Sequence, residues 1–152
     1  MVIFIFKNSD VVYDYGKFTL DKFEFENGIV IENPEVEFRA RGVPKYDESG
    51  NITNAILICH KYDGNCSSID ELYSITCEGA AFDSNKYFLI SISSLGTPDS
   101  CSPSTTGLRY EFPEYTFSDK VNFKKQFLAE KFNIETVYCL VGEGLGGFEV
   151  LT

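Results

Sequence analysis

The sequence predicts an α/β fold, in which parallel strands alternate with helices that cross over the faces of one sheet. Three continuous apolar runs, Ala55–Cys59, Tyr87–Ile92 and Thr136–Val141, are typical of strands that are covered on both faces. Helical patterns lie between these runs, and such alternation indicates right-handed crossovers between parallel strands. The length of 152 residues suits a single domain.

An antiparallel hairpin is expected at the front of the chain. The segment Phe18–Glu26 is rich in aromatic residues, and an Asn27-Gly28 turn follows it. Val36–Ala40 alternates strictly between apolar and polar residues, which indicates a half-exposed strand. These two segments are therefore predicted to pair.

Two helices are expected between the buried strands. Ser68 is a candidate N-cap for a short helix. Thr116 is a candidate N-cap for a longer helix that runs to about Phe132, with Asp119 in its first turn. The longer helix carries two apolar stripes and should be buried on two sides. The stripes are Phe117, Val121, Leu128 and Phe132, and Phe123 with Phe127.

The composition is acidic and globular, with a net charge of −10 and 43% hydrophobic residues. This charge argues against binding to nucleic acid or anionic lipid, which requires clustered lysine and arginine. The chain contains only two basic clusters, and both are interpreted as solvated faces. The clusters are Arg39 with Arg41, and Lys120 with Lys124 and Lys125.

The cysteines and the N-terminal residues give expectations about metal binding and the cellular compartment. The five cysteines include no CxxC pair, so neither a zinc site nor another metal or cofactor is expected. Cys59 and Cys139 lie in apolar runs and should pack as small hydrophobic residues. This usage suits the reducing cytoplasm. The apolar run Val2–Phe6 is too short for a signal peptide or a membrane span, so no membrane partner is expected.

A glycine-rich motif follows the third buried strand. It reads G-E-G-L-G-G from Gly142 to Gly147, the spacing of a G-x-S-x-G nucleophile elbow between a strand and a helix. Gly142 and Gly146 match the two small residues of that elbow. Gly144 stands where the nucleophilic serine is needed, and a residue without a side chain cannot form a covalent acyl-enzyme.

This motif and several upstream segments resemble the homoserine O-acetyltransferase family of α/β-hydrolases, whose elbow typically reads Gly-Gly-Ser-Met-Gly-Gly. The similarity spans roughly Phe18 to Thr152. It implies the N-terminal half of an α/β-hydrolase fold, in which residues 1–152 form one partial domain that ends just after the elbow. The other matching segments, in family order, are Asn54–His60, Phe82–Ile90, Ser94–Gly96 with Ser104–Gly107, and the helix start at Phe112, Pro113, Thr116, Asp119 and Val121.

The resemblance also implies roles for individual residues. By position, the backbone N–H groups of Tyr62 and Leu145 would be the oxyanion-hole donors. The catalytic acid and histidine follow the nucleophile in this fold, so neither is expected before Thr152. His60 is the only histidine and precedes the elbow. Its ring is interpreted as bonded to nearby backbone rather than as a general base.

The same residues also fit other patterns. Gly142, Gly144 and Gly147 also fit a dinucleotide fingerprint, which requires a complete helix and a later acidic residue. Cys101 would be a reactive thiol only if its pKa were low. The carboxylates that flank the glycines, Glu143 and Glu149, are interpreted as exposed to solvent. The hydroxyl groups of the loop Gly96–Pro113 are interpreted as structural.

Three functions follow as hypotheses. The chain is a truncated pseudoenzyme, a binding or scaffold module that pairs with a homologue, or one part of an acyl-CoA-dependent O-acyltransferase. The last would carry acetyl from acetyl-CoA to homoserine in methionine biosynthesis, as the resemblance implies. Acyl-CoA is an expected ligand only if a pocket remains. The last strand should have an uncovered edge, which invites self-association or pairing with another chain.

Overall fold

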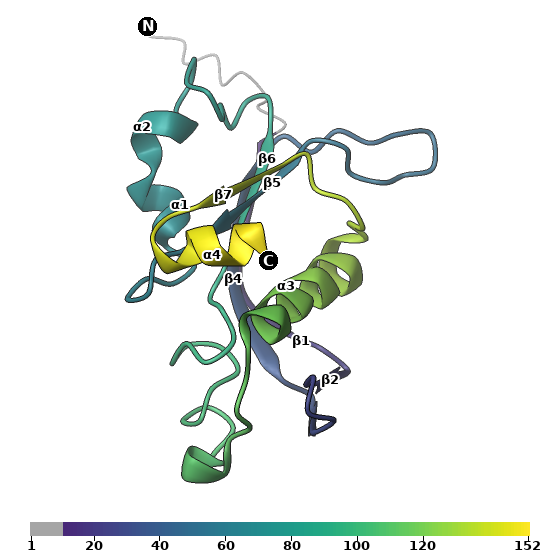
Figure 1. The fold of residues 1–152 in the computed structure, drawn as a ribbon. Helices are drawn as coiled ribbons and strands as arrows, with labels where there is room; N and C mark the ends of the chain where they lie inside the picture. Colours follow the sequence, from purple (N-terminus) through teal and green to yellow (C-terminus); the bar gives the residue numbers. More distant parts are fainter. Residues whose placement is uncertain (1–10) are drawn as a thin grey trace, which may run out of the picture.

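The computed structural model describes residues 11–152, and the apolar run Val2–Phe6 lies outside them. A five-stranded mixed sheet forms the centre of the fold, with its strands in the order β1-β4-β6-β5-β7 (Figure 1). A separate two-stranded sheet, β2-β3, lies near one end of it. The strands of the large sheet are β1 (Val12–Thr19), β4 (Glu35–Gly42), β5 (Ala55–Cys59), β6 (Phe88–Ile92) and β7 (Cys139–Gly142).

The three apolar runs form the parallel part of the sheet, as the sequence predicts. Strand β5 pairs in parallel with β6 on one side and with β7 on the other. Every residue of β5 and β6 is buried, which fits their apolar sequences; the one polar residue, Ser91 in β6, donates its hydroxyl to the Ile58 carbonyl. Strand β7 is half-covered and begins at Cys139 rather than at Thr136.

The helices confirm one prediction and modify another. The longer helix has Thr116 as N-cap and forms a reciprocal capping box with Asp119, as the sequence signals indicate. The short helix is broken at Leu72 into two single turns, and its N-cap is Ser67 rather than Ser68. No helix within residues 11–152 has both the length and the apolar character to cross a membrane. The helices are α1 (Ser68–Glu71), α2 (Tyr73–Thr76), α3 (Phe117–Phe132) and α4 (Leu145–Leu151), with a 3₁₀ turn at Arg109–Glu111.

The antiparallel front differs from the predicted hairpin. Strand β4 pairs antiparallel with β1 along its whole length and with β6 on its other side, and only the first two residues of the aromatic segment, Phe18 and Thr19, take part, opposite Val36 and Glu35. The rest of the aromatic segment supplies β2 (Lys22–Glu24), which forms a small hairpin with β3 (Val30–Glu32), with Gly28 at φ 82° in the turn. The reason is tertiary, because the buried ring of Phe23 packs edge-on against Phe123 of α3 with ring centroids 5.2 Å apart.

Apolar clusters cover both faces of the sheet. The larger cluster joins β4, β5 and β6 to α3, where Phe123 and Phe127 are completely buried. The smaller cluster joins Ile56, Ile58 and Leu89 to Ile69 of α1 on the other face. Helices α3 and α4 lie next to each other, with the C-terminus between β7 and α3 (Figure 1). This arrangement places the turn from β7 into α4 at the carboxyl ends of the parallel strands.

Candidate functional site

The turn between β7 and α4 has the backbone of a strained strand-to-helix elbow. Gly144 adopts φ 54° and ψ −117°, a conformation that residues with a side chain rarely adopt. The Glu143 N–H donates to the Cys59 carbonyl at 3.3 Å, and the Gly146 N–H donates to the Glu143 carbonyl at 2.9 Å. The turn is therefore anchored on the end of β5, with a strand before it and a helix after it.

Close backbone approach explains two of the elbow glycines. A Cβ atom on Gly142 would lie 2.6 Å from the carbonyl carbon of Gly146, and one on Gly146 would lie 2.6 Å from the carbonyl carbon of Cys59. Neither position has room for a side chain. Gly144 differs, because its nearest neighbour would be Lys61 Cβ at 3.6 Å, an ordinary contact. The elbow thus has space for a serine that the sequence does not supply.

A cavity of about 440 Å³ lies beside the elbow. Tyr62 and Leu145, the two residues that the resemblance assigns to the oxyanion hole, both line it. Leu145 is the first residue of α4, so its N–H has no acceptor within the helix. The Tyr62 side chain is 85% exposed. The structure brings these two residues to one cavity, while their role as oxyanion donors stays a prediction.

His60 is held by backbone groups at both ring nitrogens. Its Nε2 accepts the Ser94 N–H at 2.9 Å, which leaves the proton on Nδ1 to donate to the Lys61 carbonyl at 2.7 Å. Burial lowers the pKa of His60 and favours the neutral ring. The structure confirms that this imidazole bonds nearby backbone, and neither nitrogen is free to accept a proton.

Glu149 and Lys124 are not solvated, contrary to the sequence interpretation. Each side chain is only 3% exposed, and Lys124 Nζ lies 2.7 Å from Glu149 Oε2. The Ser94 hydroxyl accepts from Lys124 Nζ at 2.6 Å and donates to Glu149 Oε1 at 3.1 Å. Lys120 Nζ lies 3.6 Å from the same Oε1 atom. We call these four residues the ionic cluster; it ties α3, α4 and the loop after β6 together beneath the elbow.

Sequence reasoning missed this cluster because burial depends on how two helices face each other. The one available signal was the i, i+4 spacing of Lys120 and Lys124, which places both on one face of α3. Lys125 and Glu143 are exposed as expected. The cluster contains two ammonium groups and one carboxylate, so α4 is held to α3 by charge as well as by packing.

The other basic cluster is also less solvated than expected. The Arg41 side chain is 16% exposed and lies between the sheet and the short helices. It donates to Asp70 Oδ1 at 3.1 Å, to Thr76 Oγ1 at 2.6 Å and to the Ile69 carbonyl at 3.1 Å. Arg39 remains about half exposed and pairs with the same Asp70. These arginines hold α1 and α2 against β4.

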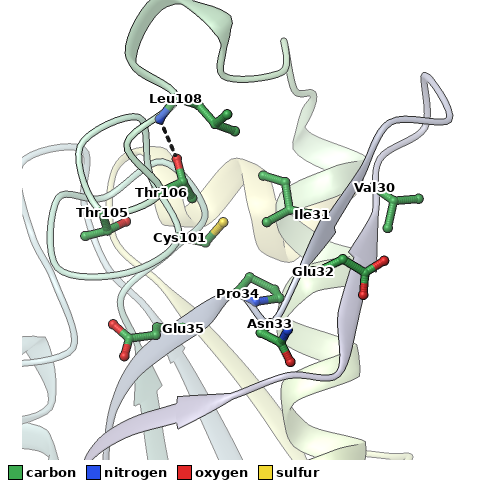
Figure 2. A pocket seen from close by; sticks show the side chains of 10 residues that line it. All are labelled: Val30, Ile31, Glu32, Asn33, Pro34, Glu35, Cys101, Thr105, Thr106 and Leu108. Atoms are coloured by element: carbon green, nitrogen blue, oxygen red, sulfur yellow. Dashed lines mark hydrogen bonds between the residues drawn. The ribbon is translucent and has the colours of Figure 1, made fainter.

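Cys101 lies in a different cavity from the elbow. A cavity of about 360 Å³ separates the β3–β4 segment from the loop after β6, and Figure 2 shows Cys101 facing it near Ile31, Pro34 and Thr105. It shares no lining residue with the elbow cavity. Burial raises the pKa of Cys101 to about 12, so its thiol is protonated at neutral pH. Cys101 is therefore not a nucleophile for the elbow.

Thiol labelling is expected to follow burial. In the folded chain, Cys77 and Cys139 are partly exposed, whereas Cys59, Cys66 and Cys101 are buried with raised pKa values. Iodoacetamide at about pH 8, followed by peptide mass spectrometry, should label Cys101 roughly a hundredfold more slowly than Cys77. Labelling in urea, where all five thiols should react alike, is the control. Equal rates for Cys101 and Cys77 in the folded chain would contradict the placement of Cys101.

The loop hydroxyls bond to one another, and the acidic side chains of the described residues form no metal site. Ser102 Oγ lies 3.0 Å from both Ser104 Oγ and Thr105 Oγ1, and Thr106 Oγ1 donates to the Ser102 carbonyl at 2.7 Å. These hydroxyl groups form hydrogen bonds within their own loop, which agrees with the structural role expected from the sequence. Among residues 11–152, His, Cys, Asp and Glu side chains form no group of three that could hold a metal ion.

Comparison with known proteins gives a consistent set of relatives. No protein-family model matches the chain. The "Probable acyltransferase" of Methanothermobacter thermautotrophicus is 46% identical over 134 residues, which cover 88% of this chain and 41% of the relative. The "Homoserine O-acetyltransferase" of Deferribacter desulfuricans is 34% identical over 149 residues, which cover 86% of this chain and 38% of the relative. An acetylester hydrolase structure from Corynebacterium glutamicum matches with a TM-score of 0.75 at 28% identity, covering 90% of this chain and 38% of that chain.

These matches agree with the fold. The chain spans less than half the length of the relatives it matches. The relatives named homoserine O-acetyltransferase confirm the resemblance inferred from the sequence, and the mixed sheet with its crossover helices matches the fold of the solved structure. This chain is therefore a homologue of the homoserine O-acetyltransferases and related acyltransferases, and it has the N-terminal part of their α/β-hydrolase fold.

Proposed function

We propose that this chain is a non-catalytic, acyltransferase-like protein that keeps the oxyanion side of an acyl-transfer site and lacks the nucleophile. The observation that carries the proposal is Gly144, whose backbone has the elbow conformation although the residue has no side chain. Because oxyanion donors are backbone groups, Tyr62 and Leu145 would keep this role despite the loss of the serine. Without a nucleophile, no covalent acyl-enzyme forms at the elbow.

Three further features support the proposal. The only histidine has both ring nitrogens engaged with backbone, so it is not a general base. Cys101, the other candidate nucleophile, is protonated and lines another cavity. The elbow cavity of about 440 Å³ falls in the size range of small-ligand sites and would admit the acetyl end of acetyl-CoA. The five free thiols favour a reducing setting such as the cytoplasm.

The alternative function is one part of an active acyltransferase that moves acetyl from acetyl-CoA to homoserine. The names of several relatives favour it, because they are homoserine O-acetyltransferases. Gly144 argues against it, since a partner can supply an acid and a histidine but cannot restore a side chain at the elbow. The two functions therefore differ in whether the natural chain is acylated.

Acylation by acetyl-CoA tests the proposal directly. The natural chain, Gly144→Ser and the matched control Gly144→Ala are each co-expressed with the part of the Methanothermobacter acyltransferase that follows its matched segment. Intact-protein mass spectrometry then measures acetyl transfer to the chain. We expect acylation of Gly144→Ser alone, because only serine adds a hydroxyl that a partner's histidine can activate.

Two results would contradict the proposal in different ways. Acylation of the natural chain or of Gly144→Ala would show that another residue acts as nucleophile. A Gly144→Ser complex that assembles but stays unacylated would show that the oxyanion side is not intact. Complex formation is measured separately by light scattering, so failed assembly is not mistaken for failed chemistry.

A further inference from the structure

The ionic cluster carries one more positive charge than its own carboxylate balances. Lys124 Nζ lies 2.7 Å from Glu149 Oε2, and the Ser94 hydroxyl donates to Glu149 Oε1 at 3.1 Å, so both oxygens of this carboxylate have a close partner. Lys120 Nζ lies 3.6 Å from Oε1, beyond the usual length of a hydrogen bond. Among residues 11–152 it forms no other ion pair. The Lys120 ammonium is therefore left without an anion of its own.

This ammonium lies at the elbow cavity. Lys120 is one of the residues that line the cavity of about 440 Å³, and Lys124 is not. The Lys120 side chain is 15% exposed, so it reaches the cavity with most of its surface removed from bulk water. Burial lowers the pKa of Lys120, because the charged form has lost part of its hydration. An anion in the cavity would stabilise the charged form again.

Tyr115 holds the lysine side chain at the cavity wall. Lys120 Nζ lies 5.7 Å from the centroid of the Tyr115 ring, within reach of a cation–π contact. The tyrosine is seated against Gly96, where an added Cβ atom would overlap its hydroxyl oxygen. Tyr115 and Gly96 both line the cavity. The glycine thus makes room for the tyrosine hydroxyl there, and this hydroxyl is a second candidate donor to a bound anion.

The charges around the cavity favour an anion with a single charge. Lys61 lines the cavity but pairs with Glu71 at 3.8 Å, and Asp63 places an exposed carboxylate at the same cavity. A dianion would meet this carboxylate and the net charge of −10 on the chain with only one unbalanced ammonium to attract it. A small carboxylate carries one charge and two acceptor oxygens, which suit one ammonium and one hydroxyl.

We infer that the elbow cavity binds a small monocarboxylate, whose oxygens contact the Lys120 ammonium and the Tyr115 hydroxyl. The inference deepens the proposed function by naming a ligand class for the cavity beside Gly144, and it rests on that proposal only in treating the bound ligand as retained rather than consumed. The two fail separately. Acetylation of the natural chain would contradict the absence of catalysis, whereas missing carboxylate binding would contradict this site.

Titration with sodium acetate tests the site, with acetamide as an uncharged ligand of the same shape. The backbone amide NMR signals of the natural chain are followed at pH 7 while acetate replaces chloride at constant ionic strength. We expect saturable shifts at the residues that line the elbow cavity. Acetamide should bind at least about tenfold more weakly, because a hydrogen bond between two charged groups is stronger than one to a neutral acceptor. Inorganic phosphate should also bind more weakly than acetate.

Variants of two lysines on α3 separate Lys120 from the other charges. Lys120→Met should weaken acetate binding at least about tenfold, because it removes the ammonium and keeps an unbranched side chain. Lys120→Arg keeps the positive charge and should retain most of the binding. Lys125→Met is the matched control, since Lys125 is exposed and does not line the cavity, and it should bind acetate as the natural chain does. Circular dichroism establishes that each variant is folded.

Three results would overturn the inference. Acetate that produces no saturable shifts at the cavity shows that no carboxylate site is present. Acetamide or phosphate that binds as tightly as acetate shows that the cavity does not select a single negative charge. Equal acetate binding by Lys120→Met and Lys125→Met removes Lys120 from the site. The comparison of acetate with acetamide uses the natural chain, so it decides the question even where Lys120→Met does not fold.

Discussion

Replacing Gly146 by alanine is expected to lower the free energy of unfolding by about 3 kcal/mol, at the upper end of the cost of overpacking a rigid site. The added Cβ would lie 2.6 Å from the carbonyl carbon of Cys59 and 2.7 Å from the carbonyl oxygen of His60. Both atoms belong to backbone at the end of β5, so no side-chain rotation relieves the overlap. Urea unfolding followed by circular dichroism measures the loss.

Gly147→Ala provides a matched control one residue along the same helix. Its added Cβ would have no neighbour closer than the Gly142 carbonyl oxygen at 3.9 Å. Alanine also favours the helix over glycine by up to about 1 kcal/mol, so this variant should be neutral or slightly more stable. If both variants lost the same stability, the contact of Gly146 with Cys59 and His60 would not be the cause, and the close packing of α4 on the end of β5 would be wrong.

Replacing Lys124 by alanine is expected to cost about 3 kcal/mol of unfolding free energy, the range seen when one partner of a buried ion pair is removed. The change deprives Glu149, which is 3% exposed on its side chain, of the ammonium group 2.7 Å away. Lys120 at 3.6 Å remains as a partner and keeps the cost from being larger. Lys125→Ala, at an exposed neighbouring position, should change stability by less than about 0.5 kcal/mol.

A double variant separates charge from packing at this position. Lys124→Gln combined with Glu149→Gln removes both charges of the pair and keeps side chains of similar length, but it leaves the Lys120 ammonium without its carboxylate, so it should recover only part of the stability lost in Lys124→Ala. Urea unfolding of the single and double variants gives the comparison. A double variant as unstable as Lys124→Ala would contradict the ionic origin of the effect. A Lys124→Ala variant as stable as Lys125→Ala would show that the cluster adds nothing to the fold.

The sequence patterns predict the parallel strands and the capped helix because local signals and tertiary structure agree there. Ala55–Cys59 has no polar residue and Tyr87–Ile92 has one serine, Ser91, near its end, and such runs are typical of a strand covered on both faces. Thr116 and Asp119 satisfy each other's backbone groups within one turn of chain, so the start of α3 does not depend on distant contacts. The elbow spacing is equally local, since it describes one turn between a strand and a helix.

The sequence by itself determined the fold class, the order of the parallel strands and helices, the start of α3 and the absence of a side chain at position 144. These follow from local periodicity, capping and spacing. The tertiary structure alone decided that most of the aromatic segment leaves β4 and pairs with β3 instead, and that Lys124 and Glu149 are buried together. It also decided that Cys101 faces a separate cavity. Each of these features depends on which surfaces of distant segments come into contact. The packing of β2, α3 and α4 determines those contacts, and no pattern within one segment does.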